Sequence, residues 1–326
     1  MTIKLINPFK KEQELVPGSQ GLDTISGSPV FPLVNGAYRV LQTENNYTDN
    51  FGFQWNKFSK TQIDTESQTS QISRIRFFAE TNWDKEDLTG KNVLEVGSGA
   101  GRFSQVVLKN TNATLYSVDY SNAVEANFKN NGHFQNRLTL FQASIYDMPF
   151  ASQQFDKVFC MGVLQHTPDV ERSVKTLIEM AKPGAEVVVD FYAIKGWWTK
   201  VCAKYMLRPI TKKWSSEKLL SKIENNIGWM IRLYKFLHKI KLGVLARFIP
   251  IVDIYGTLPY KNLNEQELRE WCILDTFDMF SPEYDQPQKL GTVVNWFKKY
   301  GMGNVKGEFV KFENAYAAVV KGTKDL

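Results

Sequence analysis

The sequence between residues 95 and 103 reads Glu95-Val96-Gly97-Ser98-Gly99-Ala100-Gly101-Arg102-Phe103. It follows an apolar run, 93–96, that predicts a strand, and it opens a run with helical spacing, 101–109. Glycines are needed in such a corner because the backbone turns sharply and must approach a ligand closely. The free N–H groups at the start of the helix can then bind polar ligand atoms. The stretch therefore predicts a nucleotide-binding loop.

The spacing of the glycines discriminates between cofactors. A dinucleotide fingerprint requires glycines at its first, third and sixth positions, and here the sixth position is Arg102. The third glycine comes early, at Gly101, and this Glu-x-Gly-x-Gly-x-Gly form resembles the first motif of the class I S-adenosylmethionine (SAM)-dependent methyltransferases. The resemblance implies SAM as methyl donor and a Rossmann-like fold. Taken alone, a glycine loop is also compatible with a plain strand–turn–helix corner.

Strand-like and helix-like runs alternate through the middle of the chain, which predicts a parallel sheet with helices on both faces. The alternation stops after residue 192 and resumes near the C-terminus. With the family resemblance, it predicts an α/β fold whose mostly parallel sheet has seven strands. The expected parts are an N-terminal arm and lid (1–84), a core (85–192 and 266–326) and an inserted basic helical cap (193–265). Within the arm, helical spacing predicts a helix over 67–81.

Asp119 ends the second predicted strand, 22 positions after Gly97. A carboxylate at this point can accept hydrogen bonds from both ribose hydroxyls, although it can also cap the next helix. The stretch 142–150 is similar to the family's adenine-binding segment, which usually carries Asp where this chain has Ser144. The cofactor contacts that the resemblance implies are Glu95, Gly97, Ser98, Gly99, Gly101, Arg102, Asp119, Tyr120, Ser121, Ala143, Ser144, Met161 and Gly162.

His166 is the candidate catalytic base. It follows the fourth predicted strand, in a stretch (155–169) that resembles the family motif at the mouth of the sheet. An imidazole with an ordinary pKa near 6.5 suits removal of a hydroxyl proton. The alternative is a histidine that caps a helix or packs beside SAM. Asp190 and Tyr192 can also face an acceptor or be structural, and Asp275 and Asp278 belong to an acidic aromatic stretch that can line the pocket. The candidate acceptor contacts are Gln54, Trp55, Tyr192, Arg208 and Asp275.

The N-terminal region adds a narrower likeness. Residues 31–36 and 51–58 resemble a subgroup of bacterial methyltransferases often associated with polysaccharide or other specialised biosynthesis. Some of those relatives carry N-terminal cysteine pairs that suggest a zinc ribbon; these are missing here, and no His/Asp/Glu cluster has ligand spacing, so no metal is predicted. The segment 47–58 is too aromatic for a solvated linker and is expected to fold over the cofactor cleft, or to pack on the sheet edge.

Charge is unevenly spread. The net charge is +6, but fourteen Lys or Arg against four acids give the segment 193–265 a charge of +10 and leave −4 elsewhere. Its helices mix cations with large aromatics. This mix is compatible with a solvated basic face, with an anionic membrane surface, or with a cap whose cations meet an anionic acceptor. We favour the cap, with Arg208 beside Pro209 as the anion contact.

The bulk composition is that of an ordinary globular protein of 326 residues, 43% hydrophobic and 23% charged. Three cysteines without motif spacing, no long apolar run and no secretory leader predict a soluble cytoplasmic protein. We expect a methyltransferase acting on a small-molecule or glycan acceptor, with a hydroxyl favoured. The alternatives are a non-catalytic SAM-binding protein, a membrane-associated enzyme with a lipid-linked acceptor, and an NAD-dependent oxidoreductase. No nucleic-acid partner is expected, because no recognition module is present.

Overall fold

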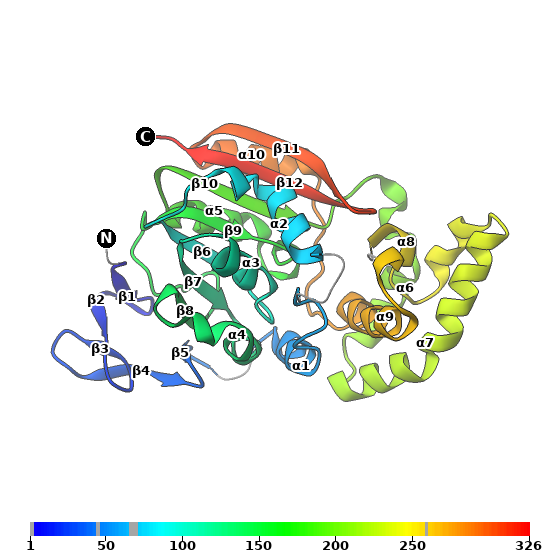
Figure 1. The fold of residues 1–326 in the computed structure, drawn as a ribbon, viewed down its shortest axis with the longest axis horizontal. Coiled ribbons are helices and arrows are strands. Elements are labelled where there is room, and N and C mark those ends of the chain that lie inside the picture. The colour runs from blue at the N-terminus through cyan, green and yellow to red at the C-terminus, as the bar shows by residue number, and fades with distance from the viewer. Residues whose placement is uncertain (1–2, 44–45, 65–70, 258–259) are drawn as a thin grey trace.

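The computed structural model describes residues 3–43, 46–64, 71–257 and 260–326. A twelve-stranded sheet runs through the molecule in the order β1-β2-β3-β4-β5-β8-β7-β6-β9-β10-β12-β11 (Figure 1). Its parallel centre consists of β6 (Asn92–Val96), β7 (Thr114–Asp119), β8 (Leu138–Ala143), β9 (Phe155–Cys160) and β10 (Ala181–Phe191). At one end of this centre β12 (Ala315–Lys324) pairs antiparallel with both β10 and β11 (Met302–Phe312). The predicted α/β fold is confirmed.

The sheet is larger than the seven strands expected. The additional strands are β1 (Leu5–Asn7), β2 (Lys10–Pro17), β3 (Gly21–Thr24), β4 (Pro29–Val34) and β5 (Ala37–Val40). The first four pair antiparallel in succession, and β4 turns through Asn35-Gly36 into β5, which lies parallel to β8. Their apolar side chains join the main core, so the N-terminal part of the predicted arm extends the sheet.

Successive residues of the central strands point to opposite faces of the sheet. Val93 packs in the cluster under α2 (Ile72–Thr81) and α3 (Arg102–Asn110), whereas Leu94 packs with α5 (Val170–Met180) and α10 (Leu290–Lys299). The side chains of α4 (Val124–Asn131) cover β5 and β8. Helices therefore cover both faces, as the alternation predicted. Of the helix predicted over 67–81, positions 67–70 lie outside the described residues.

The inserted segment folds as a helical cap with its own apolar core. α7 (Ser216–Lys239) packs along α9 (Glu265–Phe280), and α9 begins at a capping box in which Asn264 and Glu267 bond each other's backbone. The cap therefore continues to the end of α9, past the predicted boundary at 265, because Trp271 and Phe277 bury their side chains against it. Its other elements are η4 (Trp197–Lys200), α6 (Ala203–Thr211), η5 (Gly243–Phe248), α8 (Ile254–Thr257) and η6 (Tyr260–Asn262).

Three shorter connections and one arm helix complete the elements: η1 (Trp83–Lys85), η2 (Gly132–Arg137), η3 (Leu164–His166) and α1 (Asp49–Lys57). In Figure 1, α1 lies between the sheet and the cap, at the edge to which the parallel strands lead. Within the described parts of the chain, no helix combines the length and apolar character needed to cross a membrane.

Candidate active site

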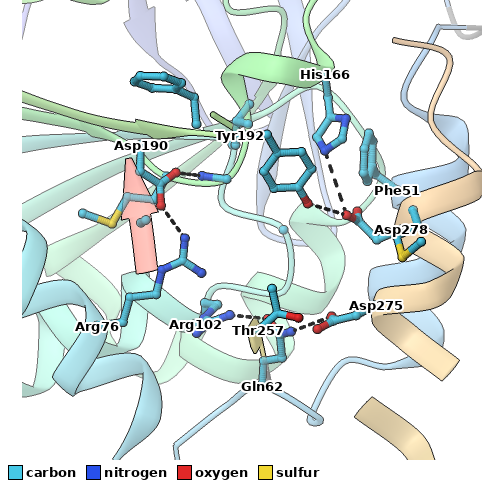
Figure 2. Close-up of a pocket in the computed structure, with 18 of the residues that line it drawn as sticks. Phe51, Gln62, Arg76, Arg102, His166, Asp190, Tyr192, Thr257, Asp275 and Asp278 are labelled. Atoms are coloured by element: carbon cyan, nitrogen blue, oxygen red, sulfur yellow. Dashed lines mark hydrogen bonds and ion pairs between the residues drawn. The ribbon is translucent and has the colours of Figure 1, made fainter. Parts of the chain in front are cut away.

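A cavity of about 610 Å³ lies between the carboxyl ends of the parallel strands, α1 and the cap. Its size is within the range of pockets that hold small ligands, about 300–1,000 Å³. Residues far apart in the sequence line it, and several of them are labelled in Figure 2. The predicted site residues that line it are Gln54, Trp55, Gly97, Ser98, Gly99, Arg102, Asp119, Tyr120, Ala143, Met161, Gly162, His166, Tyr192 and Asp275.

The glycine loop has two distinct tasks. Gly99 has φ +53° and lines the cavity, and a Cβ there would lie 3.0 Å from the indole nitrogen of Trp55. Gly101 has φ +83°, and a Cβ there would lie 2.2 Å from the Asn127 side chain on α4. Only glycine fits either position without strain. Gly101 therefore serves helix packing behind the cavity wall and not, as predicted, contact with the cofactor.

Asp119 fixes the glycine loop from the end of β7. Its Oδ2 accepts the Gly99 N–H at 2.8 Å, and its Oδ1 accepts the N–H and hydroxyl of Ser121 at 2.8 and 2.6 Å. Burial raises the pKa of this carboxyl, while these hydrogen bonds favour its ionised form. Oδ1 already accepts two hydrogen bonds, but Oδ2 has a second lone pair, so Asp119 can still accept a hydrogen bond from a ligand.

Three further predicted cofactor contacts lie behind the wall. The Glu95 Oε2 accepts hydrogen bonds from the hydroxyls of Ser104 and Ser117, and burial raises the pKa of Glu95 to about 7. Ser121 is engaged by Asp119, and the Ser144 hydroxyl accepts the Tyr146 N–H at 3.2 Å. These side chains hold the loops in place, a role that motif matching does not separate from ligand contact.

The aromatic arm covers the glycine loop. From α1, Trp55 lies against Gly99, and the ring of Phe51 lies 5.1 Å from that of His166. The amide of Gln54 is buried at the cavity, and neither its nitrogen nor its oxygen has a hydrogen-bond partner among the residues described. Asn50 bonds Ser281 at 2.9 Å and ties α1 to the cap. The arm thus lies over the cleft; its opening and closing stays a prediction.

His166 lies on one side of the cavity with both ring nitrogens defined by their neighbours (Figure 2). Its Nδ1 lies 3.0 Å from the carbonyl oxygen of Tyr284, and its Nε2 lies 4.0 Å from Asp278 Oδ2. Because a carbonyl only accepts, Nδ1 carries the proton of the neutral ring and Nε2 carries the lone pair. Burial lowers the pKa of His166, although Asp278 opposes this effect. The Tyr192 hydroxyl donates to the same Asp278 oxygen at 3.0 Å.

The side of the cavity opposite His166 holds an ionic cluster that the sequence did not predict. Arg76 on α2 donates to Asp190 at the end of β10 and, at 2.8 Å, to Glu80. Asp190 also accepts the N–H of Gly162, so it joins β10, α2 and the loop after β9. Burial, with repulsion from Asp190, raises the pKa of Glu80. A single arginine in an aromatic helix carries no spacing signal that sequence reasoning could have used.

A polar chain crosses the floor of the cavity (Figure 2). Arg102 donates to the side-chain oxygen of Gln62, whose nitrogen donates to Asp275 at 3.3 Å. Burial, and secondarily the nearby Arg76, lowers the pKa of Arg102 to about 10, and its Nε has no hydrogen-bond partner in the described part of the chain. Burial, together with repulsion from Asp278, raises the pKa of Asp275 to about 7.

The structure contradicts the prediction that Arg208 contacts an acceptor. Its side chain is buried outside the cavity lining, donates to the carbonyls of Met279 (3.1 Å) and Pro282 (2.9 Å), and lies 3.9 Å from Asp285. It fixes the end of α9 to α6. The basic cap residues that do line the cavity are Lys195, Lys204 and Arg247. The sequence could not predict which cations line the cavity, because nothing in the spacing of the fourteen Lys and Arg residues of the segment distinguishes them.

Comparison with known proteins finds a methyltransferase domain in the middle of the chain. Residues 94–189 match the family model of a methyltransferase domain. The ubiquinone biosynthesis O-methyltransferase of Coxiella burnetii is 34% identical over 101 residues, which are 31% of this chain and 43% of that protein. The tRNA U34 carboxymethyltransferase of Nautilia profundicola is 30% identical over 111 residues, 34% of this chain and 37% of that protein. The chain thus spans less than half the length of these curated relatives.

Among solved structures, the magnesium protoporphyrin IX methyltransferase of Synechocystis with bound SAH has a TM-score of 0.47 and 13% identity, with 86% of this chain and 97% of that one covered. The residues that match the methyltransferase-domain family model, 94–189, include the glycine loop, Asp119 and His166. In this chain the strand that precedes the glycine loop, β6, lies at the centre of the parallel strands. The match over residues 94–189 identifies a SAM-dependent methyltransferase domain within this chain.

Proposed function

We propose that this protein transfers the methyl group of SAM to a hydroxyl of a small-molecule or glycan acceptor, with His166 as general base. One observation carries the proposal. The Nε2 of His166 is buried at the cavity and has no hydrogen-bond partner among the described residues, while its Nδ1 is held by a backbone carbonyl. A buried lone pair without a partner is costly unless a ligand satisfies it. A hydroxyl is the acceptor group that such a nitrogen can bind and deprotonate.

The cofactor half of the cavity fits SAM. The Oδ2 of Asp119 would accept a hydrogen bond from its ribose, and the absence of a side chain at Gly99 allows close approach. The unpaired polar atoms of Gln54, Ser98 and Arg102 are suited to the amino and carboxylate groups of its methionine portion. When bound, SAM supplies an electrophilic methyl group on its sulfonium. The chain then needs to orient the acceptor, exclude water and remove one proton.

Two neighbours complete the role of His166. The carbonyl of Tyr284 fixes the ring orientation, and Asp278, 4.0 Å from Nε2, would stabilise the charge once the ring is protonated. Tyr192 holds Asp278 in place. Because burial lowers the pKa of His166, the ring is neutral and basic at physiological pH. Positioning by such neighbours contributes about 7–11 kcal/mol in well-oriented reactions.

An anionic acceptor, such as a phosphate-bearing sugar or carrier-linked glycan, remains our preferred class, now with different contacts. Arg247 lines the cavity, and its Nε has no hydrogen-bond partner among the described residues. Lys195 lines the cavity as well, and its side chain is in contact with the ring of Phe309. A guanidinium binds phosphate or carboxylate groups bidentately.

The test is release of S-adenosylhomocysteine from SAM in the presence of a panel of acceptors: free sugars, sugar phosphates, carrier-linked glycans, phenols and amines. We expect turnover with hydroxyl acceptors, and we expect no turnover with the same acceptors when their free hydroxyl has been methylated beforehand. Turnover confined to amines would overturn the hydroxyl assignment. Tight SAM binding by calorimetry with no turnover across the whole panel would favour the non-catalytic SAM-binding protein instead.

A further inference from the structure

The cap exposes more apolar surface than the rest of the molecule. Fourteen of the 24 large apolar side chains that are exposed in the described structure lie between residues 197 and 248. Trp197 is 83% exposed and Val244 is 77% exposed, and both are among the most exposed of the set. Contiguous apolar exposure of this kind marks an interaction surface rather than a solvated face.

Eight of these side chains lie on η4, on η5, or on the last turn of α7 and the residues that join it to η5, and these elements contact one another in succession. The Arg247 guanidinium on η5 donates to the Trp198 carbonyl on η4. The Leu242 N–H bonds the Leu237 carbonyl at 2.8 Å, and η5 packs on α7. The docking surface defined here consists of Trp197, Trp198, Phe236, Ile240, Leu242, Val244, Leu245 and Phe248. In Figure 1, α7 forms the edge of the molecule farthest from the N-terminal strands.

α7 shows how the surface is built. Its exposed apolar residues Trp229, Leu233, Phe236 and Ile240 follow the spacing i, i+4, i+7, i+11, which places them on one face of the helix. Its buried residues, such as Ile227, Met230 and Tyr234, form a separate face toward the cap core. The helix therefore has two apolar faces, and among the residues that the structure describes only one of them is packed against a partner.

The charge around the surface is positive. Lys200, Arg232, Lys235, Lys239 and Lys241 are exposed on the same elements. The sequence contains no Asp or Glu from 195 to 216 or from 225 to 252. A surface with lysines around exposed tryptophans and aliphatic side chains matches the boundary of an anionic bilayer, where apolar groups enter the acyl region and cations meet lipid phosphates. Two copies of this surface would repel each other. Half of its eight side chains, Ile240, Leu242, Val244 and Leu245, are aliphatic and do not stack on nucleic-acid bases.

We propose that η4, η5 and the C-terminal half of α7 dock on an anionic lipid bilayer. The docking surface is joined to the cavity through η5, because Arg247 lines the cavity from the same turn that exposes Val244, Leu245 and Phe248. Docking would therefore place the cap side of the cavity next to the lipid. The inference does not depend on which acceptor is methylated.

The test is flotation of the full chain with vesicles of phosphatidylcholine alone and of phosphatidylcholine with one third phosphatidylglycerol. Binding to the anionic vesicles, reduced by salt, is expected. Val244→Asp is expected to lower the apparent affinity about tenfold, because it removes apolar contact and adds a repelled charge. The matched control is Ile25→Asp, which makes the same charge change at a 69% exposed position near the N-terminus and should leave binding unchanged.

SAM affinity, measured on both variants, verifies that each is folded. Equal loss of vesicle binding in the two variants would show a non-specific charge effect and overturn the proposal. It would also be overturned if the wild-type chain failed to float with anionic vesicles. Concentration-dependent dimerisation that Val244→Asp abolishes, without vesicle binding, would assign the surface to a second copy of the chain. Methyl transfer in solution is measured separately, so failure of docking leaves the proposed function untouched.

Discussion

The two sides of the cavity are built by different means. On the cofactor side, the key contact joins the backbone of Gly99 to Asp119, twenty positions away, across two neighbouring strands. On the acceptor side, Arg76 meets Asp190 across 114 positions, His166 meets Tyr284 across 118, and Gln62 meets Asp275 across 213. The first side uses backbone geometry that a short motif can encode. The second uses side chains that come from the arm, the sheet and the cap.

The largest effect that we expect comes from replacing His166, which should slow catalysis without weakening SAM binding. His166→Asn keeps a donor toward the Tyr284 carbonyl and removes the base, so kcat should fall by about 10²–10⁴ while the SAM Kd changes little. Steady-state kinetics with an acceptor found in the panel and calorimetry with SAM measure the two effects. Tyr192→Phe, which removes only the bond to Asp278, is the control and should cost far less. An unchanged kcat in His166→Asn would remove histidine from the chemistry.

The same residue gives a pH dependence. The base must be unprotonated to act, and burial lowers the pKa of His166 below its ordinary 6.5. We therefore expect kcat to rise with pH through an apparent pKa below 6.5 and to be level at pH 7 and above. The profile of His166→Asn should lack this acidic limb. A limb that persists in the variant would assign it to another group.

On the cofactor side, Asp119→Ala should raise the SAM Kd about a hundredfold or more, because charged hydrogen bonds of about 1.5–3 kcal/mol each are lost together with the anchor of the Gly99 N–H. Gly99→Val should also weaken SAM binding, since a Cβ there meets Trp55. Calorimetric titration measures both. Asp147→Ala removes a carboxyl that lies outside the cavity lining and is the matched control. Wild-type affinity in both site variants would contradict the cofactor assignment.

A variant of Arg208 tests whether this side chain stabilises the fold and does not contact the acceptor. Arg208→Ala leaves the carbonyls of Met279 and Pro282 without their donor and weakens the pairing of buried Asp285. We expect a loss of about 2–3 kcal/mol in the free energy of unfolding, seen by thermal or urea denaturation, with SAM affinity retained. Lys213→Ala changes an exposed cation of the same segment and should be neutral. A raised acceptor KM with unchanged stability would restore Arg208 as a substrate contact.

The smallest expected effect concerns Asp275. Its pKa is raised from 3.8 to about 7, so the folded state holds its proton more tightly than the unfolded chain does, and stability falls as pH rises between these values. Asp275→Asn should therefore raise the free energy of unfolding by about 1–2 kcal/mol above pH 7 and have no effect near pH 4. Denaturation at the two pH values measures this. Equal effects at both would show that the carboxyl is not held neutral by burial.

The sequence by itself determined the fold class and the cofactor, and it placed the glycine loop between a strand of the sheet and the helix that follows. This was possible because strand–loop–helix corners impose local rules: positive φ at Gly99, close helix packing at Gly101, and a carboxylate at the end of the next strand. The same reasoning placed His166 at the sheet edge, because the ends of parallel strands meet there.

Only the tertiary structure decided which side chains reach the acceptor side. Arg208 donates to backbone carbonyls and Arg247 lines the cavity, although both are arginines in the same basic segment. It brought Arg76 to Asp190, and it extended the sheet through β5 and the cap through α9. These outcomes depend on which apolar faces pack together over long sequence separations. No local spacing encodes that choice, because it is set by the packing of whole elements against one another.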